Sequence, residues 1–153
     1  MVLAKKEQIT ALTDELSSYL EGEKLVLIAT VGHDVAVPNV NAISWVKSLN
    51  EKKIRFSVTT NSRIIENIKA NPGVVLNLIG LETVYSIQGN ASILESPMEG
   101  VSLKLAKIEV EVEQVFESMF WGAKITQEPE YEKTYNPEKA KELDEEVYNA
   151  LMK

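Results

Sequence analysis

The chain has 153 residues, a formal net charge of −7 and no cysteine. This length is typical of one domain with one hydrophobic core. Because cysteine is missing, disulfides, thiolate catalysis and cysteine-bound metal centres are excluded. The negative charge repels phosphate backbones at long range, so we do not expect nucleic-acid binding.

Nothing in the sequence indicates a membrane or export segment. No apolar run approaches the roughly 18–20 residues that a membrane-spanning helix needs. The first ten residues, MVLAKKEQIT, lack the long apolar core of a secretory signal. We therefore expect a cytoplasmic protein that binds no membrane.

The first third of the chain predicts one helix followed by strands. In residues 5–20, apolar side chains recur at helical spacing, and Gly22 is a plausible stop. Residues 24–31, KLVLIATV, form a short apolar run rich in β-branched side chains, which is typical of a buried strand. Residues 39–47, NVNAISWVK, predict a second strand, and SLNEKK predicts the turn of a hairpin.

In the third strand, IRFSVT, apolar and polar side chains alternate. The period then becomes helical over residues 64–68, and Pro72 ends this short helix. VVLNLI, VYSIQGNASIL and IEVEVEQVF predict three more strands, and Gly89 indicates a bulge or a close backbone approach. Residues 96–99, SPME, predict the capping box of a short helix, and Asn136-Pro137 begins a final helix.

These elements predict a mainly β fold with flanking helices, in the form of a six-stranded antiparallel split β-barrel. Six alternating strands tend to close on themselves, because closure removes exposed sheet edges. We expect a single domain over residues 1–153, with an N-terminal helix in 1–22, the barrel in 23–126 and the C-terminal helix in 136–152.

The junction between the third strand and the short helix predicts an anion site. The chain has only two arginines, Arg55 and Arg63, and Arg63 lies at this junction, in TTNSR. The first N–H groups of a helix lack internal partners, and the helix dipole favours a negative charge there. Hydroxyls and a guanidinium suit a phosphate. Serine and threonine are also ordinary helix caps, so the junction alone leaves both interpretations open.

The order of these segments resembles the FMN-binding split β-barrel family, which includes the pyridoxamine 5′-phosphate oxidases and small bacterial FMN-binding proteins. The resemblance rests on IATVG, PNVNAISWV and IRFSVTTNSR, followed by NPGVVL. It covers roughly residues 24–94 and continues more weakly through IEVEVEQVF and FWGAKI. It implies a flavoprotein with FMN as its cofactor, and a homodimer with FMN between the subunits.

The resemblance also implies which residues bind the flavin. The phosphate would bind after the third strand, the ring would lie along the second strand, and the strand around residue 88 would complete the pocket. The residues implied are, in that order, Thr59, Thr60, Ser62 and Arg63; Asn41, Ala42, Ile43 and Ser44; and Gln88 and Gly89.

Two departures from the family bear on its activity. Many oxidases of the family have a lysine after the junction arginine, where this chain has Ile64. Their basic, tryptophan-containing C-terminal segment is replaced by an acidic one, KELDEEVYNALMK. The resemblance therefore does not extend to true pyridoxamine 5′-phosphate oxidase activity.

We expect an FMN-dependent oxidoreductase that passes electrons between a donor such as NAD(P)H and a small-molecule acceptor. The alternative is a module without turnover that binds flavin or haem, or senses redox state. A structural protein that has lost the cofactor is the third possibility. No catalytic residue is predicted, because the redox chemistry of such proteins belongs to the cofactor.

Four other features have simple structural interpretations. The single histidine, His33, is predicted in a loop and cannot form a histidine metal cluster. The glutamates of EVEVE, residues 109–113, are predicted to form the solvent-exposed face of a strand. Trp45 is predicted to pack in the core or a dimer contact, with flavin stacking as the alternative. Trp121 follows a long strand, and in a dimeric barrel it could line the pocket of the partner and stack on a flavin or a substrate.

Overall fold

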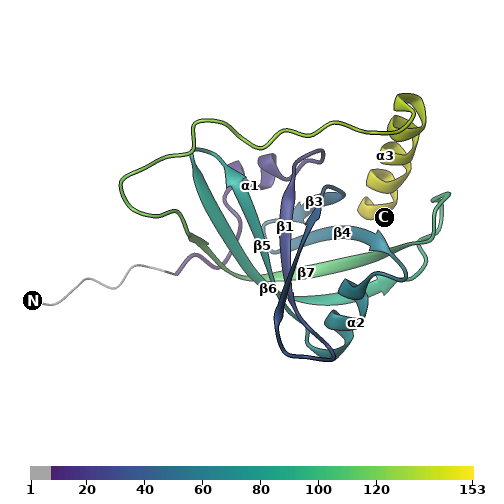
Figure 1. Cartoon of the computed structure of the whole chain (residues 1–153), viewed down its shortest axis with the longest axis horizontal. Coiled ribbons are helices and arrows are strands. Elements are labelled where there is room, and N and C mark those ends of the chain that lie inside the picture. Colours follow the sequence, from purple (N-terminus) through teal and green to yellow (C-terminus); the bar gives the residue numbers. More distant parts are fainter. Residues whose placement is uncertain (1–7) are drawn as a thin grey trace, which may run out of the picture.

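A computed structural model describes residues 8–153 and shows a curved, seven-stranded antiparallel sheet with flanking helices (Figure 1). The strand order is β2-β1-β5-β6-β7-β4-β3. The mainly β fold with flanking helices is therefore confirmed. The strands are β1 (Val26–Val31), β2 (Pro38–Ile43), β3 (Val46–Asn50), β4 (Lys53–Thr59), β5 (Gly73–Gly80), β6 (Thr83–Glu95) and β7 (Leu105–Glu117). The helices are α1 (Asp14–Tyr19), α2 (Arg63–Ala70) and α3 (Pro137–Met152).

The two edge strands of the sheet, β2 and β3, follow one another directly in the chain. β2 ends one edge at Ile43, and β3 begins the other edge at Val46, so Ser44 and Trp45 link the two edges. The Ser57 N–H in β4 donates to the Trp45 carbonyl at 3.0 Å and holds this link in place. Within residues 8–153, no strand pairing joins β2 to β3 or β4, so the barrel stays open on that side.

This link corrects the prediction of one strand over residues 39–47. The segment contains parts of two strands, and the predicted count of six strands was one too low. The physical reason is that the Ser44–Trp45 backbone crosses from one edge to the other. The Ser44 carbonyl accepts a hydrogen bond from the Tyr148 hydroxyl at 2.9 Å instead of a ladder partner.

The first helix is shorter than predicted. Residues 1–7 lie outside the described part of the chain, and residues 8–13 are not helical. Ile9 forms a strand-like bridge with Val115, and the Leu12 N–H donates to the Glu51 carbonyl at 2.8 Å. These backbone groups bond to the sheet region, so a helix cannot begin until Thr13, whose side chain caps α1.

Residues 96–99 form a turn between β6 and β7, so the predicted short helix is wrong. The Met98 N–H donates to the Leu105 carbonyl at 2.7 Å, which connects the turn to the start of β7. The prediction for Gly89 is confirmed. The β6–β7 register shifts at Gln88/Gly89, and a Cβ on Gly89 would lie 2.4 Å from the Glu111 carbonyl oxygen.

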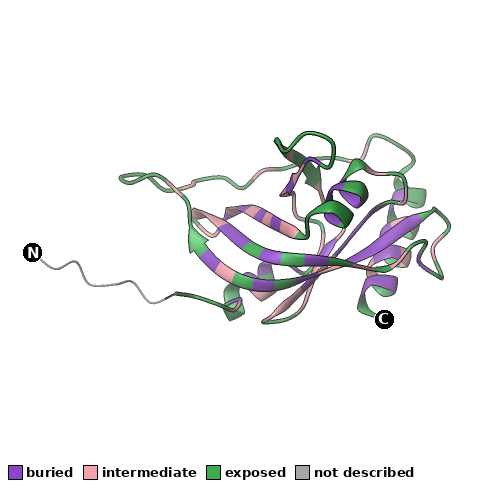
Figure 2. Ribbon diagram, turned by 90° about the horizontal axis from the view of Figure 1, so that it is seen from below, coloured by how far each residue is buried: buried purple, intermediate pink, exposed green. Residues whose placement is uncertain are grey.

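Buried and exposed residues alternate along the strands, and the core lies inside the curved sheet (Figure 2). Phe56, Leu76 and Ile108 are fully buried there. Burying one such side chain contributes roughly 1.5–3 kcal/mol. A second, smaller cluster lies under α3, where Leu105, Leu151 and the partly buried Trp45 meet. α3 therefore packs against the end of the molecule where the two sheet edges are linked.

α3 begins and ends as the sequence predicts. The Asn136 side chain accepts hydrogen bonds from the backbone N–H groups of Glu138 and Lys139, and proline occupies the first turn. The long segment between β7 and α3 runs around the outside of the sheet before α3 packs beside β3 and β4 (Figure 1). None of the helices in the described part of the chain is long and apolar enough to cross a membrane.

Candidate functional site

A hollow of about 440 Å³ lies on the open side of the barrel, and we call it the β2–β4 hollow. Four separate parts of the chain form its walls: the end of β2 with the link, the end of β4, the start of α2, and the segment before α3. The lining residues are Asn41, Ala42, Ile43, Ser44, Trp45, Ser57, Val58, Thr59, Ser62, Ile64, Lys133 and Tyr135.

The alternation of β4 explains how its polar side chains reach this hollow. Phe56 is fully buried in the main core, so the neighbouring odd-numbered side chains leave the opposite face of the strand. On that face the Arg55 guanidinium donates to the Leu151 carbonyl of α3 at 2.9 Å. Ser57 and Thr59 follow on the same face and border the β2–β4 hollow.

Ser57 has a buried hydroxyl without a partner. The residue is 2% exposed, and its Oγ atom is the single buried side-chain polar atom in residues 8–153 that has no hydrogen bond. A buried hydroxyl without a partner costs roughly 1–3 kcal/mol. Because Ser57 borders a hollow, a ligand that enters it is a natural partner for this hydroxyl. Sequence reasoning missed Ser57, although its shared strand face with Thr59 was visible.

Ser62 acts as an ordinary helix cap. Its hydroxyl accepts a hydrogen bond from the Ile64 N–H at 3.2 Å, and its carbonyl accepts one from the Ile65 N–H at 3.0 Å. The Thr60 N–H donates to the Lys104 carbonyl at 3.1 Å. Several donors predicted for an anion therefore already have protein partners, while the Thr59 side chain borders the hollow.

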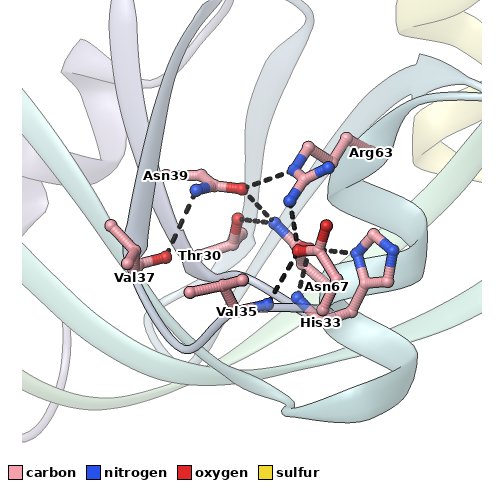
Figure 3. Close-up of polar contacts among 8 residues, drawn as sticks. Thr30, His33, Val35, Val37, Asn39, Arg63 and Asn67 are labelled. Carbon is pink, nitrogen blue, oxygen red and sulfur yellow. Dashed lines mark hydrogen bonds and ion pairs between the residues drawn. The ribbon is translucent and has the colours of Figure 1, made fainter.

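Arg63 is engaged outside the β2–β4 hollow (Figure 3). Its Nε donates to Asn39 Oδ1 at 2.9 Å, and its Nη2 pairs with the Asp34 carboxylate. The backbone N–H groups of Val35 and Asp34, together with this guanidinium, lower the pKa of the Asp34 carboxyl group. A phosphate role for Arg63 stays a prediction, and it requires the guanidinium to leave Asp34 or to share it.

Asn67 lies at the centre of the same network of polar contacts (Figure 3). It is fully buried, and its Nδ2 donates to Thr30 Oγ1 and Asn39 Oδ1, both at 2.9 Å. Its Oδ1 accepts the His33 N–H at 2.9 Å and lies 2.8 Å from His33 Nδ1. The network joins α2 to the β1–β2 hairpin, and the predicted loop position of His33 is confirmed.

The structure brings most of the predicted residues together but not all of them. The six that line the β2–β4 hollow are Asn41, Ala42, Ile43, Ser44, Thr59 and Ser62. Thr60 and Arg63 lie beside it in the chain but outside its walls. Gln88 and Gly89 border a different hollow of about 380 Å³ over β1, β5 and β6, which we call the outer hollow. Within one chain, this last pair is not part of the same site.

Sequence reasoning missed the contribution of the C-terminal part of the chain. Lys133 and Tyr135 come from a polar stretch to which the sequence assigned no role. Trp45 packs partly buried in the second cluster, and its Nε1 donates to Asp144 Oδ1 at 2.8 Å. Asp144 is buried on α3, so α3 holds one wall of the hollow. No local pattern indicates a contact between residues so far apart in sequence.

The glutamates of β7 differ partly from the prediction. Glu111 and Glu113 are exposed, as expected. The Glu109 side chain is only 14% exposed, because it pairs with Arg55 Nε at 2.9 Å and Lys53 Nζ at 3.5 Å. Residues 8–153 contain no converging group of three or more histidine, aspartate or glutamate side chains. The Trp121 side chain is 97% exposed, so its role toward a partner stays a prediction.

A match to a protein-family model shows which family this chain belongs to. Residues 12–130 match the family model described as pyridoxamine 5′-phosphate oxidase. The chain belongs to this family. The family match contains the link between the sheet edges and most of the walls of the β2–β4 hollow, whereas Lys133 and Tyr135 lie beyond it.

Solved structures show the same fold as the family match. A pyridoxamine 5′-phosphate oxidase-like protein from Lactobacillus delbrueckii is 22% identical to this chain, with a TM-score of 0.60. The match covers 71% of this chain and 95% of the Lactobacillus chain. An F420 reductase is 23% identical, with 69% and 98% covered and a TM-score of 0.57. HutZ, the haem storage protein of Vibrio cholerae, is 17% identical, with 69% and 94% covered and a TM-score of 0.53. No curated protein sequence is significantly similar to this chain.

The β2–β4 hollow of this family member has features that fit a flavin phosphate ester. Its lining combines apolar side chains, such as Ile43 and Val58, with side chains that carry hydroxyl groups, such as Ser57 and Thr59. The Ser57 hydroxyl borders this hollow and has no hydrogen-bond partner within residues 8–153, which is the strongest local indication that a ligand binds here. Ile64 lines the same hollow, at the position where the resemblance leads us to expect a lysine.

Proposed function

We propose that the chain binds FMN in the β2–β4 hollow and acts as an FMN-dependent oxidoreductase. The observation that carries this proposal is a convergence. Residues from β2, β4 and the start of α2, all implied by family resemblance, line one hollow that also borders a buried hydroxyl without a partner. The family membership of the chain and the similar fold of an F420 reductase support the proposal.

In this proposal the residues of the hollow bind and orient the cofactor. Asn41 to Ser44 supply a wall from an edge strand, which leaves backbone N–H and C=O groups of β2 without a neighbouring strand. Ser57 and Thr59 add hydroxyl groups from β4, and Ile43 and Val58 exclude water from the apolar part. The bound flavin would supply the electron transfer between a donor such as NAD(P)H and a small acceptor.

We also propose that the protein works as a homodimer. The β1–β2 hairpin exposes three valines, with Val35 63%, Val37 55% and Val40 61% exposed. A group of exposed apolar side chains is typical of an interaction surface. The outer hollow, which contains Gln88 and Gly89, includes Pro38 from the same β2 strand. A second copy of the chain that packs on this surface would place its own residues against Gln88 and Gly89.

Titration with FMN tests the proposed function. We expect wild-type protein to quench the fluorescence of added FMN and to shift its visible absorption bands. Ala42→Trp should abolish both changes, because it fills the hollow. Ala70→Trp, at the exposed end of α2 and outside the hollow, is the matched control and should bind FMN normally. A wild-type protein that leaves the flavin spectrum unchanged, or an Ala42→Trp variant that binds normally, would contradict the proposal.

Two further measurements separate the alternatives that the sequence leaves open. Rapid reduction of the bound flavin by NADH or NADPH in a stopped-flow instrument favours an oxidoreductase, and inertness favours a binding module. Titration with haemin tests the haem alternative. The single histidine, His33, lies outside the β2–β4 hollow, so a Soret band that is lost in His33→Ala would favour haem at a different place.

A further inference from the structure

We propose that Lys133 supplies the positive charge that binds the anionic group of the ligand in the β2–β4 hollow. This inference rests on the proposed function and deepens it. In residues 8–153, Lys133 is the one charged side chain among those that line the hollow. It comes from the segment before α3, about seventy residues after the junction at which the family resemblance leads us to expect a cation.

The other residues in and near the junction do not supply a positive charge to the hollow. Ile64 lines the hollow with an apolar side chain and is 2% exposed. Lys53 pairs with Glu109 at 3.5 Å, and Lys69 pairs with Glu66 at 3.6 Å. Neither lysine borders the hollow. Arg63 is held by Asp34 and Asn39, so the cation in the hollow comes from a distant part of the chain.

Lys133 is positioned but not fully engaged. Its Nζ lies 3.3 Å from each of the two carboxylate oxygens of Asp144. Close charge-assisted contacts are about 2.7–2.9 Å, so this pair is loose. An ammonium group has three N–H donors. The centre of the Tyr131 ring lies 5.6 Å from Nζ, and Lys133 also lines a second hollow of about 730 Å³ together with Glu128 and Glu130. The ammonium group therefore keeps donors for a ligand.

Asp144 acts as a positioning residue for this lysine. Its side chain is 8% exposed, and its Oδ1 accepts the Trp45 indole N–H at 2.8 Å. Trp45 also lines the hollow, so Asp144, which lies behind the lining residues, connects Trp45 to Lys133. A phosphate that approaches Lys133 changes the electrostatic surroundings of Asp144, and the Trp45 indole N–H should sense that change directly.

Under the proposed function, the anionic group that Lys133 binds is the phosphate monoester of FMN. A lysine acts as a point charge, so it attracts the phosphate without enforcing a bidentate geometry. FMN and riboflavin have the same ring and differ in the phosphate, whereas inorganic phosphate has the anion without the ring. Comparing the three ligands therefore separates the contribution of the anion from that of the ring.

The first experiment compares the affinities of FMN and riboflavin in lysine variants. We expect the wild type to prefer FMN, and Lys133→Met to lower that preference by about tenfold or more, the scale of a lost charged hydrogen bond. Lys133→Arg keeps the charge and should retain the preference. Lys124→Met is the matched control, because Lys124 lies in the same segment, 68% exposed, and outside the hollow.

The second experiment needs no flavin and follows the two tryptophan indole N–H signals by NMR. Inorganic phosphate should shift the Trp45 signal in the wild type and in Lys133→Arg, but not in Lys133→Met. The Trp121 signal, from a side chain that is 97% exposed, is the internal reference. Trp121→Phe assigns the two signals.

The outcomes separate this inference from the proposed function. If the wild type binds FMN and Lys133→Met keeps the full preference for FMN, Lys133 is not the anion ligand and the inference is overturned. If no flavin binds but phosphate shifts Trp45 only when residue 133 is cationic, the proposed function fails and the inference stands. If phosphate leaves Trp45 unchanged and no flavin binds, both are overturned.

Discussion

Two buried serines show how differently the same side chain can be used. Ser86 is 7% exposed, and its hydroxyl contacts Asn77 Nδ2 at 3.0 Å and Ser118 Oγ at 2.9 Å. Ser57 is 2% exposed and has no such partner. The first hydroxyl stabilises the fold, whereas the second makes folding less favourable unless a ligand is bound. A polar group kept at such a cost is typical of a binding site.

We predict opposite effects for Ser57→Ala and Ser86→Ala on the ligand-free protein. Ser57→Ala should leave the free energy of unfolding unchanged or raise it by up to about 1 kcal/mol, since it removes an unpaired buried group. Ser86→Ala should lower it by roughly 1–3 kcal/mol, because two hydrogen bonds are lost, one to the partly buried Asn77 side chain and one to the exposed Ser118 hydroxyl. Urea unfolding measures both. Equal destabilisation by the two substitutions would show that the Ser57 hydroxyl has a protein partner.

For single residues, the sequence predicted where a side chain lies better than it predicted which residues that side chain contacts. Thr59 and Ser62 border the hollow, as the strand-to-helix junction indicated. Arg63 lies at the same junction, yet its partners Asp34 and Asn39 precede it by 29 and 24 residues. No short-range pattern indicates such partners. Ser57 could have been proposed from its strand face, but its missing partner becomes visible only after the whole core is packed.

Among the elements, α3 matters most to the site, although it lies last in the chain. The Tyr148 hydroxyl donates to the Ser44 carbonyl at 2.9 Å and accepts the Glu23 N–H at 2.8 Å. Burial of the ring raises the pKa of Tyr148, and the nearby Asp144 carboxylate adds to this effect. Through Tyr148 and Asp144, α3 fixes the link between the sheet edges that forms one wall of the hollow.

We predict that the stability contributed by Tyr148 depends on pH. An unfolded tyrosine loses its proton near pH 10, whereas the folded chain keeps Tyr148 protonated to higher pH, so unfolding becomes easier as the pH rises above 10. Tyr148→Phe should lower the free energy of unfolding by about 1 kcal/mol near pH 8, and the gap to wild type should shrink by about 1 kcal/mol near pH 11.

Urea unfolding at the two pH values measures this gap. Tyr135→Phe, which changes a tyrosine that is 46% exposed, is the control for general effects of alkaline pH. A gap between wild type and Tyr148→Phe that stays constant with pH would contradict the assignment of the buried, protonated hydroxyl.

Periodicity predicted the elements well where one face of an element is buried. β4, α2 and α3 follow their patterns because each one packs a continuous apolar face. The pattern failed at residues 39–47, where the chain moves from one sheet edge to the other without losing its strand-like residues. It failed again at residues 8–13, where bonds to the sheet region replace those of a helix. Tertiary hydrogen bonds decide both cases.

At the scale of the whole molecule, the proposed homodimer rests on the open side of the barrel and on the exposed valines of the β1–β2 hairpin. We predict that the wild type has a mass in solution of about twice 17.1 kDa. Val40→Asp should give a monomer, because it places a charge in the exposed apolar group of the hairpin. Leu103→Asp, at a site 47% exposed in the β6–β7 turn, is the control and should stay dimeric. Size-exclusion chromatography with light scattering measures the masses, and a monomeric wild type would contradict the proposed assembly.

The family and the fold could be predicted from the ordered segments, because they lie within about seventy residues of one another. The walls that α3 and its preceding segment add could not. Trp45 is 99 residues from its partner Asp144, and Ser44 is 104 residues from Tyr148. Such contacts depend on the path of the chain around the sheet, which no repeat or spacing in the sequence indicates.

A crystal structure of the protein grown with saturating FMN tests the central claim most directly. We predict that the flavin ring lies in the β2–β4 hollow against Asn41 to Ser44, with the Ser57 hydroxyl hydrogen-bonded to the ligand and the phosphate within reach of Lys133. A flavin seated anywhere else on the molecule, or a hollow that stays empty under these conditions, would contradict it.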